Sequence, residues 1–365
     1  MLSRLIASSS MQALGILILM LDCLVIGVAR NLDFSIHARG RERVAQQSND
    51  TNSSRRQLIN TRYFQQKAIA NYIVVDQYGY RGFKTIQSAI DHVPSWSPTW
   101  ICIHVNAGIY NEKVVIPYDK PNIIIQGEGK DSTIITWGDT ATTAYGTANS
   151  ATFTVWASNF TARGVSFKNS AAPPPPGAKD RQAVAVLVAG DMASFYFCGF
   201  YGAQDTLFDY QGRHYFKNCY IEGSIDFIFG HGQSIYKGCD LHAIAQTAGS
   251  ITAQNREDPQ DPSGFIFLEC AITGTGDVYL GRAWGAYSRV IFIRSYFSNI
   301  ILPEGWQDWS IPSREQTVYY GQYKCSGPGA NLAGRVYWSR ELSDEEAQRF
   351  LHISFINGQW WLDEA

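Results

Sequence analysis

The sequence predicts an all-β chain folded as a parallel β-helix (β-solenoid), with a short helix near each end. Short runs of β-branched and aromatic residues recur between about Ile101 and Val318, each bounded by Gly, Asn, Asp or Pro, and no long helical period separates them. A β-sandwich would also give many short strands. The β-helix is favoured because Cys198, Cys219 and Cys239 follow one another at steps of 21 and 20 residues with similar flanks, a plausible length for one solenoid coil.

The two helices are predicted from local signals. Residues Thr85–His92 (TIQSAIDH) form a short helical run that is suited to covering an open end of the core, as solenoids require. A second helix is expected to begin at Ser343, because the sequence Ser-Asp-Glu-Glu resembles a capping box. We therefore expect helices at the ends of the β-helix and strands between them.

The composition fits one large folded domain. Of the 365 residues, 45% are hydrophobic and 17% are charged, so the chain can bury an extensive core but is short for two ordinary domains. The low charged fraction is compatible with a β-rich secreted protein. The net charge of −2 provides no basic footprint for nucleic acid, so we expect no nucleic-acid partner.

Residues 1–29 are predicted to be a signal peptide. Arg4 precedes an apolar run from Leu14 to Val28, and small residues lie at the end of this run. Asp22 interrupts the run, which argues against a stable membrane span, although a retained signal anchor is the alternative. The protein is therefore expected to be secreted.

Residues 30–67 are predicted to be a flexible, mildly basic leader, and residues 68–365 to be the folded catalytic domain. The leader is rich in Ser, Asn, Gln and Arg and has little apolar periodicity. Glycosylation sequons occur at Asn49, Asn52 and Asn159. They predict a glycoprotein.

Removal of the signal peptide leaves six of the seven cysteines. They form no Cys-x-x-Cys motif, and no pair of the seven histidines has metal-ligand spacing, so we expect no metal site. Cys198, Cys219, Cys239 and Cys270 each follow a short apolar strand and share one register. Adjacent coils would bring Cys198 and Cys219 within disulfide range, and secretion favours a disulfide between them. A column of buried free thiols is the alternative.

The same spacing places two aspartates side by side. From Cys198, and again from Cys219, a glycine follows four residues later and an aspartate seven residues later; the aspartates are Asp205 and Asp226. On adjacent coils they would stack at the inter-strand distance of about 4.8 Å. Two carboxylates this close cannot both ionise cheaply, so one is expected to keep its proton. The alternative is that both only cap turns, as we expect for Asp277, which ends a third copy.

Gln182, Gln204 and Arg282 supply the remaining polar groups of the predicted site. An arginine beside a carboxylate holds it ionised through a forked contact. Glutamine amides can donate to an oxygen that becomes negative in a tetrahedral intermediate. An acid, a nucleophile, oxyanion donors and an orienting arginine are the groups needed for ester hydrolysis through an acyl-enzyme.

Five sequence blocks resemble, in the correct order, the signature blocks of plant pectin methylesterases (pectinesterases). The blocks are GIYNEKVVI (Gly108–Ile116), QAVAV (Gln182–Val186), GAQDTL (Gly202–Leu207), DFIFG (Asp226–Gly230) and LGRAW (Leu280–Trp284). The resemblance extends from about Tyr72 to Tyr323. It implies a right-handed parallel β-helix, without a metal or organic cofactor, that hydrolyses the methyl esters of homogalacturonan to pectate and methanol in the plant cell wall.

The resemblance also implies roles for the polar residues. Asp226 resembles the nucleophile and Asp205 the general acid and base. Gln182 and Gln204 resemble the oxyanion donors, and Arg282 resembles the residue that steadies the nucleophile. These five residues are the predicted catalytic set.

Substrate contacts are predicted in the same way. The predicted substrate-binding residues are Thr147, Gln182, Arg282, Trp284 and Trp306. Trp284 resembles a sugar-stacking wall, and Trp306 is a second stacking candidate with rim packing as its alternative. For Trp309 we favour rim packing. Glu112, in the first block, is expected to be structural.

Two features depart from the common family pattern. Ala283 stands where many relatives have proline, which should loosen the loop without removing the residues on either side. The chain also lacks room for a long inhibitor-like pro-region, so it resembles the short form of the family. The expected partners are methyl-esterified homogalacturonan and, as a candidate, a proteinaceous pectin methylesterase inhibitor; we expect a monomer.

Two other functions compete with the esterase. Paired carboxylates about 5 Å apart are compatible with a retaining glycosidase, and Gly230-His231-Gly232 resembles a short polygalacturonase motif. The Asn-Thr-Asp, Asp-Asp and Arg-Ile-Lys motifs of those enzymes are absent from the sequence. A non-catalytic pectin-binding wall protein is the other alternative, although binding alone would not require the five polar site residues.

Overall fold

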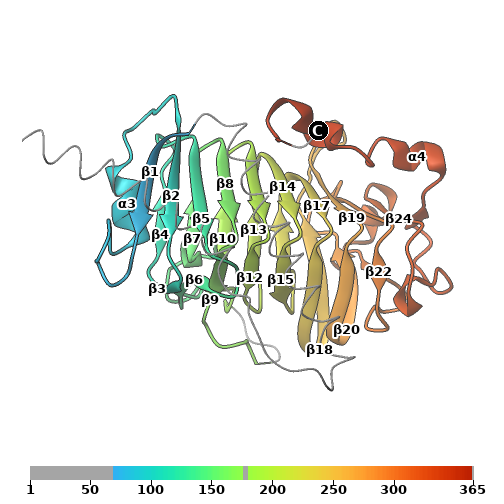
Figure 1. Cartoon of the computed structure of the whole chain (residues 1–365). Helices are drawn as coiled ribbons and strands as arrows, with labels where there is room; N and C mark the ends of the chain where they lie inside the picture. The colour runs from blue at the N-terminus through green and yellow to red at the C-terminus, as the bar shows by residue number, and fades with distance from the viewer. Residues whose placement is uncertain (1–68, 176–179, 364–365) are drawn as a thin grey trace, which may run out of the picture. The chain divides into compact units, whose positions relative to one another are not determined.

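The computed structural model describes residues 69–175 and 180–363, which form a right-handed parallel β-helix (Figure 1). One coil consists of β11 (Ala193–Tyr196), β12 (Gly199–Tyr201) and β13 (Leu207–Asp209). Each of these strands pairs in parallel with its counterpart one coil later. The predicted fold class is therefore confirmed.

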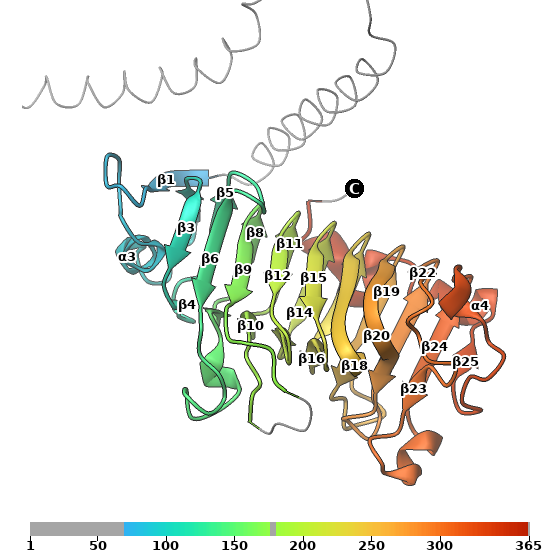
Figure 2. The same ribbon diagram turned by 90° about the horizontal axis from the view of Figure 1, so that it is seen from below.

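Successive coils build three faces, which we call the first, second and third faces. The strands of the first face are β1 (Ile69–Val75), β2 (Trp100–Val105), β5 (Ile123–Gly127), β8 (Phe160–Arg163), β11, β14 (Arg213–Lys217), β17 (Gln233–Lys237), β19 (Gly264–Leu268), β21 (Arg289–Ile293), β24 (Tyr319–Tyr323) and β25 (Arg340–Glu341). Those of the second face, seen side by side in Figure 2, are β3 (Gly108–Asn111), β6 (Thr133–Trp137), β9 (Ser166–Asn169), β12 and β15 (Tyr220–Gly223). Those of the third face are β4 (Val114–Ile116), β7 (Phe153–Val155), β10 (Val186–Val188), β13 and β16 (Ile228–Gly230).

Two long strands join the second and third faces. These strands are β18 (Asp240–Gln254) and β20 (Ala271–Arg282), followed on the next coil by the short strands β22 (Tyr296–Phe297) and β23 (Trp306–Gln307). In the preceding coils a bend separates the second face from the third. Asp277 lies within β20, opposite Ala248 of β18, so the prediction that Asp277 is a turn residue was wrong: the bend has been replaced by continuous strand.

Helix α3 (Ile86–His92) confirms the first predicted helix. The side chain of Thr85 caps it by accepting a hydrogen bond from the Ser88 N–H. The carboxylate of Glu112 accepts from the first two helical N–H groups, at 2.8 and 3.0 Å, which is the structural role expected of Glu112. Three helix residues are fully buried against the core, so α3 covers the core beside the first coils (Figure 1).

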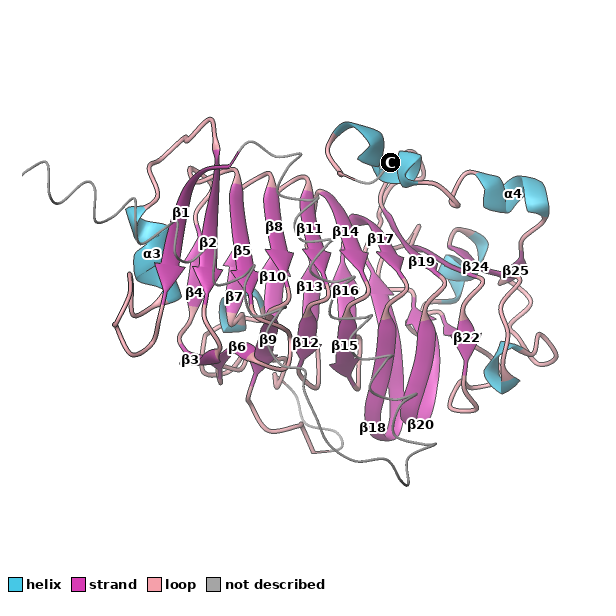
Figure 3. Cartoon of the chain, in the orientation of Figure 1, coloured by secondary structure: helices cyan, strands magenta, loops and turns pink. Residues whose placement is uncertain are grey.

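Helix α4 (Asp344–Gln348) confirms the second predicted helix. Ser343 and Glu346 form the complete capping box. The remaining helical turns, coloured cyan in Figure 3, are the 3₁₀ segments η1 (Ala148–Ser150), η2 (Pro312–Gln316), η3 (Pro328–Ala330), η4 (Ile353–Ile356) and η5 (Gly358–Trp360). Within the described ranges, no helix is both long and apolar enough to span a membrane.

Aromatic rings stack along the inside of the first face. Phe195, Phe216, Tyr236, Phe267 and Phe292 occupy equivalent positions on five successive coils. Their ring centroids are 4.5–5.0 Å apart, and adjacent planes are within 17° of parallel. This separation matches the distance of about 4.8 Å between paired strands, so the core fixes the coils in register.

The cysteines form a column, but the predicted disulfide is absent. The pairing of the strands that follow places Cys198, Cys219, Cys239 and Cys270 at equivalent positions, which confirms their shared register. All four are buried free thiols. The prediction of a Cys198–Cys219 disulfide was wrong, because each thiol is directed to a backbone carbonyl. The Cys198 thiol donates to Tyr196 O at 3.4 Å, and the Cys219 thiol donates to Phe195 O at 3.5 Å.

Some sequence predictions fall outside the described residues. They are the signal peptide (1–29), the leader (30–67) and the sequons at Asn49 and Asn52. The third sequon residue, Asn159, lies at the turn before β8. It is half-buried, and its side-chain N–H donates to Asn122 Oδ1 at 3.0 Å.

Candidate active site

Asp205 and Asp226 occupy equivalent positions on adjacent coils, as the sequence predicted. Leu207 of β13 pairs with Ile228 of β16, and each aspartate lies two residues earlier. The pairing continues into the bend, where the Asp205 N–H donates to Ile225 O at 3.0 Å. The spacing of about 4.8 Å between paired strands brings the two carboxyl groups together between the second and third faces.

Both aspartates have a left-handed backbone. Their φ angles are 63° for Asp205 and 47° for Asp226, values that few residues other than glycine adopt. Such conformations cluster at functional sites, where surrounding contacts maintain them. The nearby Gly223 allows close packing below the bend, since a Cβ atom there would lie 2.1 Å from Cβ of Phe227.

The carboxylate of Asp226 is bound by two side chains. Arg282 Nε donates to Oδ1 at 2.9 Å, and its Nη2 donates to Oδ2. Ser250 Oγ donates to Oδ1 at 2.5 Å and accepts from the Asp226 N–H at 2.9 Å. Burial is the largest single effect and would lower the pKa of Arg282, but hydrogen bonding to Asp226 and attraction to the nearby acidic groups together raise that pKa. Asp226 is therefore held as an oriented carboxylate.

The surroundings of Asp205 favour a neutral acid. Burial raises the pKa of Asp205 well above its ordinary value, and the adjacent charge of Asp226 adds to this effect, against a smaller opposing effect from Arg282. The neighbouring position on the preceding coil is the buried aliphatic Val184. Within the part of the chain that the structure describes, the Asp205 carboxyl group has no hydrogen-bond partner. The two carboxyl groups therefore have different surroundings: the Asp226 carboxyl group accepts three hydrogen bonds, whereas the Asp205 carboxyl group is buried beside an aliphatic side chain.

The two glutamines lie on adjacent coils beside this pair. Gln204 directly precedes Asp205, and its carbonyl accepts from the Ala183 N–H at 3.1 Å, which places Gln182 on the neighbouring coil. Both side chains are half-buried. In the described ranges neither amide group has a hydrogen-bond partner, so both are free to donate to a bound molecule.

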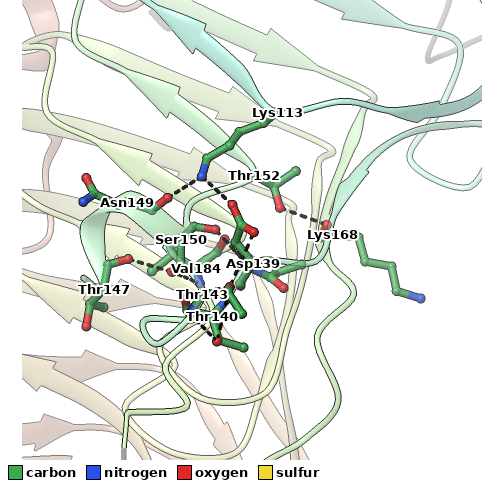
Figure 4. Close-up of polar contacts among 11 residues, drawn as sticks. Lys113, Asp139, Thr140, Thr143, Thr147, Asn149, Ser150, Thr152, Lys168 and Val184 are labelled. Atoms are coloured by element: carbon green, nitrogen blue, oxygen red, sulfur yellow. Dashed lines mark hydrogen bonds and ion pairs between the residues drawn. The ribbon is translucent and has the colours of Figure 1, made fainter. Parts of the chain in front are cut away.

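A loop from the second face reaches Gln182 and carries Thr147. The N–H of Ala141 donates to Gln182 O at 2.7 Å. Figure 4 shows how the loop is fixed: Lys113 Nζ donates to Asp139 Oδ2 at 2.7 Å and to Asn149 O at 2.5 Å. The loop is therefore tied to the backbone of a predicted catalytic residue.

Thr147 is half-buried at the start of η1. Its carbonyl accepts from Ser150 Oγ at 2.6 Å, and the same Oγ accepts from the Val184 N–H at 3.1 Å (Figure 4). Val184 is the residue beside Asp205 on the preceding coil. Thr147 is thus connected to the site through one serine.

The tryptophans divide into two kinds. Trp284 is half-buried against an apolar patch outside the β-helix core, with its ring centroid 6.1 Å from that of Phe229. Trp309 borders the same patch, and the Arg282 guanidinium lies 4.3 Å from its ring centroid. This cation–π contact was not predicted from the sequence, where rim packing is the favoured interpretation of Trp309, because local spacing gives no signal for such a contact.

Trp306 is not available to a polysaccharide, so its prediction as a substrate contact was wrong. Its side chain is only 2% exposed. The ring stacks on Tyr320 with a centroid distance of 4.4 Å and an interplanar angle of 21°. The pairing of Trp306 with Gly281 of β20 turns its side chain toward the core. Its role is packing.

The fold and this site define a class of protein: a parallel β-helix with a buried aspartate stacked on a second aspartate that is bound by an arginine. The chain belongs to the pectinesterase family, because the family model described as Pectinesterase matches residues 72–359. It is therefore a carboxylic ester hydrolase that acts on pectin methyl esters. In the described ranges no group of three His, Cys, Asp or Glu side chains is placed to hold a metal ion.

Individual relatives agree with this assignment. The Arabidopsis thaliana protein described as "Probable pectinesterase 8" is 47% identical over 300 residues, which cover 80% of this chain and 76% of that protein. The structure of pectin methylesterase from carrot has a TM-score of 0.76 and 37% identity, covering 80% of this chain and 94% of the carrot chain. A pectin methylesterase in complex with a hexasaccharide has a TM-score of 0.66 and 25% identity, covering 78% and 96%.

Proposed function

We propose that ester hydrolysis begins with attack by Asp226 on the methyl-ester carbonyl carbon of a galacturonate unit. A new C–O bond forms, and the carbonyl oxygen becomes negative in a tetrahedral intermediate. As the intermediate collapses, Asp205 gives its proton to the methoxy oxygen, and the C–OCH₃ bond breaks to release methanol. The galacturonyl group is then joined to Asp226 as an acyl-enzyme.

Water completes the cycle. Asp205, now a carboxylate, accepts a proton from the water while the water oxygen attacks the galacturonyl carbon. The bond to Asp226 breaks, its carboxylate returns, and the product carboxylic acid releases its proton to solvent. Arg282 orients the Asp226 carboxylate for attack in the first step and stabilises the carboxylate that returns in the second.

The observation that carries this proposal is the contrast within the aspartate pair. Burial raises the pKa of Asp205, which suits a group that must be protonated to donate to methanol. Asp226 is held by Arg282 through two contacts, which suits a carboxylate that must attack. The assignments follow from these environments and agree with the family resemblance.

Gln182 and Gln204 are proposed as the oxyanion donors. Their half-buried amides have no partner in the described ranges, so they lose no existing contact on donating to a developing negative charge. The loop held by Lys113 and Asp139 (Figure 4) supports Gln182, because the Ala141 N–H donates to its carbonyl. Fixed donors of this kind are most effective because they need little reorganisation during the reaction.

The proposed substrate is methyl-esterified homogalacturonan. A hexasaccharide-bound pectin methylesterase of the same fold supports a polymeric ligand. Trp284, half-buried beside Arg282, is proposed to stack against a sugar ring, and Thr147 to contact the substrate together with Gln182 and Arg282. Trp306 is excluded from this set by its burial.

We also propose that the protein is secreted to the plant cell wall as a glycosylated monomer and is open to a proteinaceous inhibitor. Residues 1–29 supply the proposed export signal. N-terminal sequencing of the protein recovered from the wall should begin after this segment. Light scattering on the same sample should give the mass of one chain.

The reaction is tested by incubating the purified protein with highly methylated pectin. Methanol release, acidity and polymer length are measured on the same samples. The proposal predicts methanol and acid without new reducing ends and without an unsaturated product that absorbs ultraviolet light. New reducing ends without methanol would instead support a glycosidase, and neither signal would support a binding protein.

A further inference from the structure

One buried hydroxyl group binds Asp226 at two points. Ser250 lies in β18, next to Asp226 in the strand register, because Ile228 pairs with Thr252 two residues later on both strands. Its Oγ donates to Asp226 Oδ1 at 2.5 Å and accepts from the Asp226 N–H at 2.9 Å. The same oxygen therefore holds both the carboxylate and the backbone of this residue.

The backbone contact compensates for the unusual conformation of Asp226. With φ at 47° and only 5% of its surface exposed, Asp226 has an N–H group that water reaches poorly. A buried N–H group without a hydrogen-bond partner destabilises a protein, because it loses its hydration without compensation. Ser250 supplies that partner and so helps to maintain the left-handed turn that presents the carboxylate.

Ser250 is itself on a rigid element. It is 1% exposed, its N–H donates to Ser224 O at 3.0 Å, and it pairs with Tyr279 of β20 on the following coil. A polar group on a strand paired on both sides positions its neighbour more accurately than one on a loop. The hydroxyl is therefore well placed to define the orientation of Asp226.

The contacts distinguish the two carboxylate oxygens. Oδ1 accepts from Ser250 Oγ and from Arg282 Nε, whereas Oδ2 accepts from Arg282 Nη2. Each carboxylate oxygen has about two lone-pair sites for hydrogen bonds. Both sites of Oδ1 are occupied, and one site of Oδ2 is left. A half-turn of the carboxylate only exchanges two equivalent oxygens, so the contacts define two positions: the serine fills the position of Oδ1, and the open lone pair lies at the position of Oδ2.

We infer that Ser250 is a positioning residue for the reaction: it holds Oδ1 of Asp226 and leaves Oδ2, which has an unused lone pair, as the attacking atom. The inference rests on the proposed role of Asp226 as nucleophile. It adds a residue outside the five predicted catalytic residues. Ser250 lies in β18, which carries none of the five and pairs with β20, the strand of Arg282.

The test is the Ser250→Ala variant, which removes one oxygen atom from a strand. We expect kcat to fall about 10- to 100-fold, the loss typical of a hydrogen bond to a charged group, and KM to change less than about twofold. Ser250→Thr, which keeps the hydroxyl and suits a strand, should restore most of the activity.

A matched control separates positioning from packing. Ser194→Ala also removes a buried hydroxyl, 2% exposed and 3.0 Å from Thr161 Oγ1, on the first face and without contact to either aspartate. It should keep the parental kcat. Melting temperatures of all variants show whether each one is folded.

Three results would overturn the inference. The first is a Ser250→Ala variant with kcat within about twofold of the parent. The second is an equal loss of kcat in Ser194→Ala, which would make the effect a general consequence of deleting a buried hydroxyl. The third is an active Asp226→Asn variant, which would remove the nucleophile assignment as well; failure of the first two tests would leave that assignment intact.

Discussion

Asp205 and Asp226 occupy the same position on two adjacent coils, and their carboxyl groups have opposite surroundings. On one side, Asp205 borders the coil that carries aliphatic Val184. On the other side, Asp226 borders the coil that carries Ser250, and Arg282 reaches it from one coil further. A repeated backbone thus gives the geometry of a pair, while the flanking coils decide the charge of each member.

This comparison explains how two identical side chains acquire different chemistry. The shared register fixes their separation, so the charge of one affects the other. Burial raises the pKa of Asp205, whereas the serine and the arginine donate three hydrogen bonds to the Asp226 carboxyl group. Each of the following predictions alters one half of the contrast.

The largest effect is expected from Asp226→Asn, which replaces the carboxylate with an amide that is a poor nucleophile. Turnover should fall by roughly 10⁴-fold or more, as measured by methanol release. Circular dichroism should be unchanged because the two side chains have nearly the same shape. Activity within a few-fold of the parent would move the nucleophile elsewhere.

Gln182→Ala and Gln204→Ala should each lower kcat by roughly 10²–10³-fold, the usual effect of losing one oxyanion donor. KM should change little, because the donors act on charge that develops in the transition state. Gln211→Ala, an exposed glutamine two residues beyond the third face, is the control and should retain activity. A rise in KM at constant kcat would identify a binding residue.

Asp205→Asn should stabilise the protein against unfolding as pH rises. Below about pH 4, Asp205 is neutral in both folded and unfolded states, so the two proteins should melt alike. Above about pH 4 the carboxyl group of Asp205 ionises in the unfolded state. In the folded state it keeps its proton, because burial raises its pKa. The parent should therefore lose about 1.4 kcal/mol per pH unit relative to Asp205→Asn until the folded group also ionises.

Thermal unfolding of both proteins between pH 4 and pH 8 measures this difference. Its sign is specific: the stability associated with the neutral carboxyl group is fully present at low pH and is lost as pH rises through the raised pKa. A melting-temperature difference that stayed constant with pH would show that Asp205 has no raised pKa.

The smallest effect is expected from Trp309→Leu. The ring faces the Arg282 guanidinium at 4.3 Å, and a partly buried cation–π contact contributes about 1 kcal/mol. Its loss should lower kcat about fivefold through looser orientation of Arg282. Trp360→Leu, at a tryptophan that is 82% exposed, is the control. An unchanged kcat in Trp309→Leu would restrict that ring to rim packing.

Much of the fold followed from spacing. The step of 21 residues from Cys198 to Cys219 predicted both the cysteine column and the stacked aspartates, because parallel coils of equal length place equivalent residues in register. The short helical run Thr85–His92 and the capping box at Ser343 predicted the two helices. These features could be predicted because each depends either on a constant coil length or on residues that are close together in the sequence.

The remaining features depend on contacts that interrupt the repeat. Asp226 and Ser250 are 24 residues apart, since the long strand β18 replaces the bend of earlier coils, so the 21-residue step gave no sign of the serine. Trp306 turns inward through its pairing with β20. The absence of a Cys198–Cys219 disulfide reflects the direction of each thiol toward backbone carbonyls, which register alone does not determine.

A site-resolved carboxyl titration can show whether the two stacked aspartates differ in protonation. The protein is labelled with ¹³C at aspartate carboxyl carbons, and the Asp205 signal is assigned as the one missing from Asp205→Asn. We predict that this signal titrates with a pKa well above the ordinary aspartate value of about 3.9. Titration of the Asp205 signal at or below the ordinary value would contradict the account.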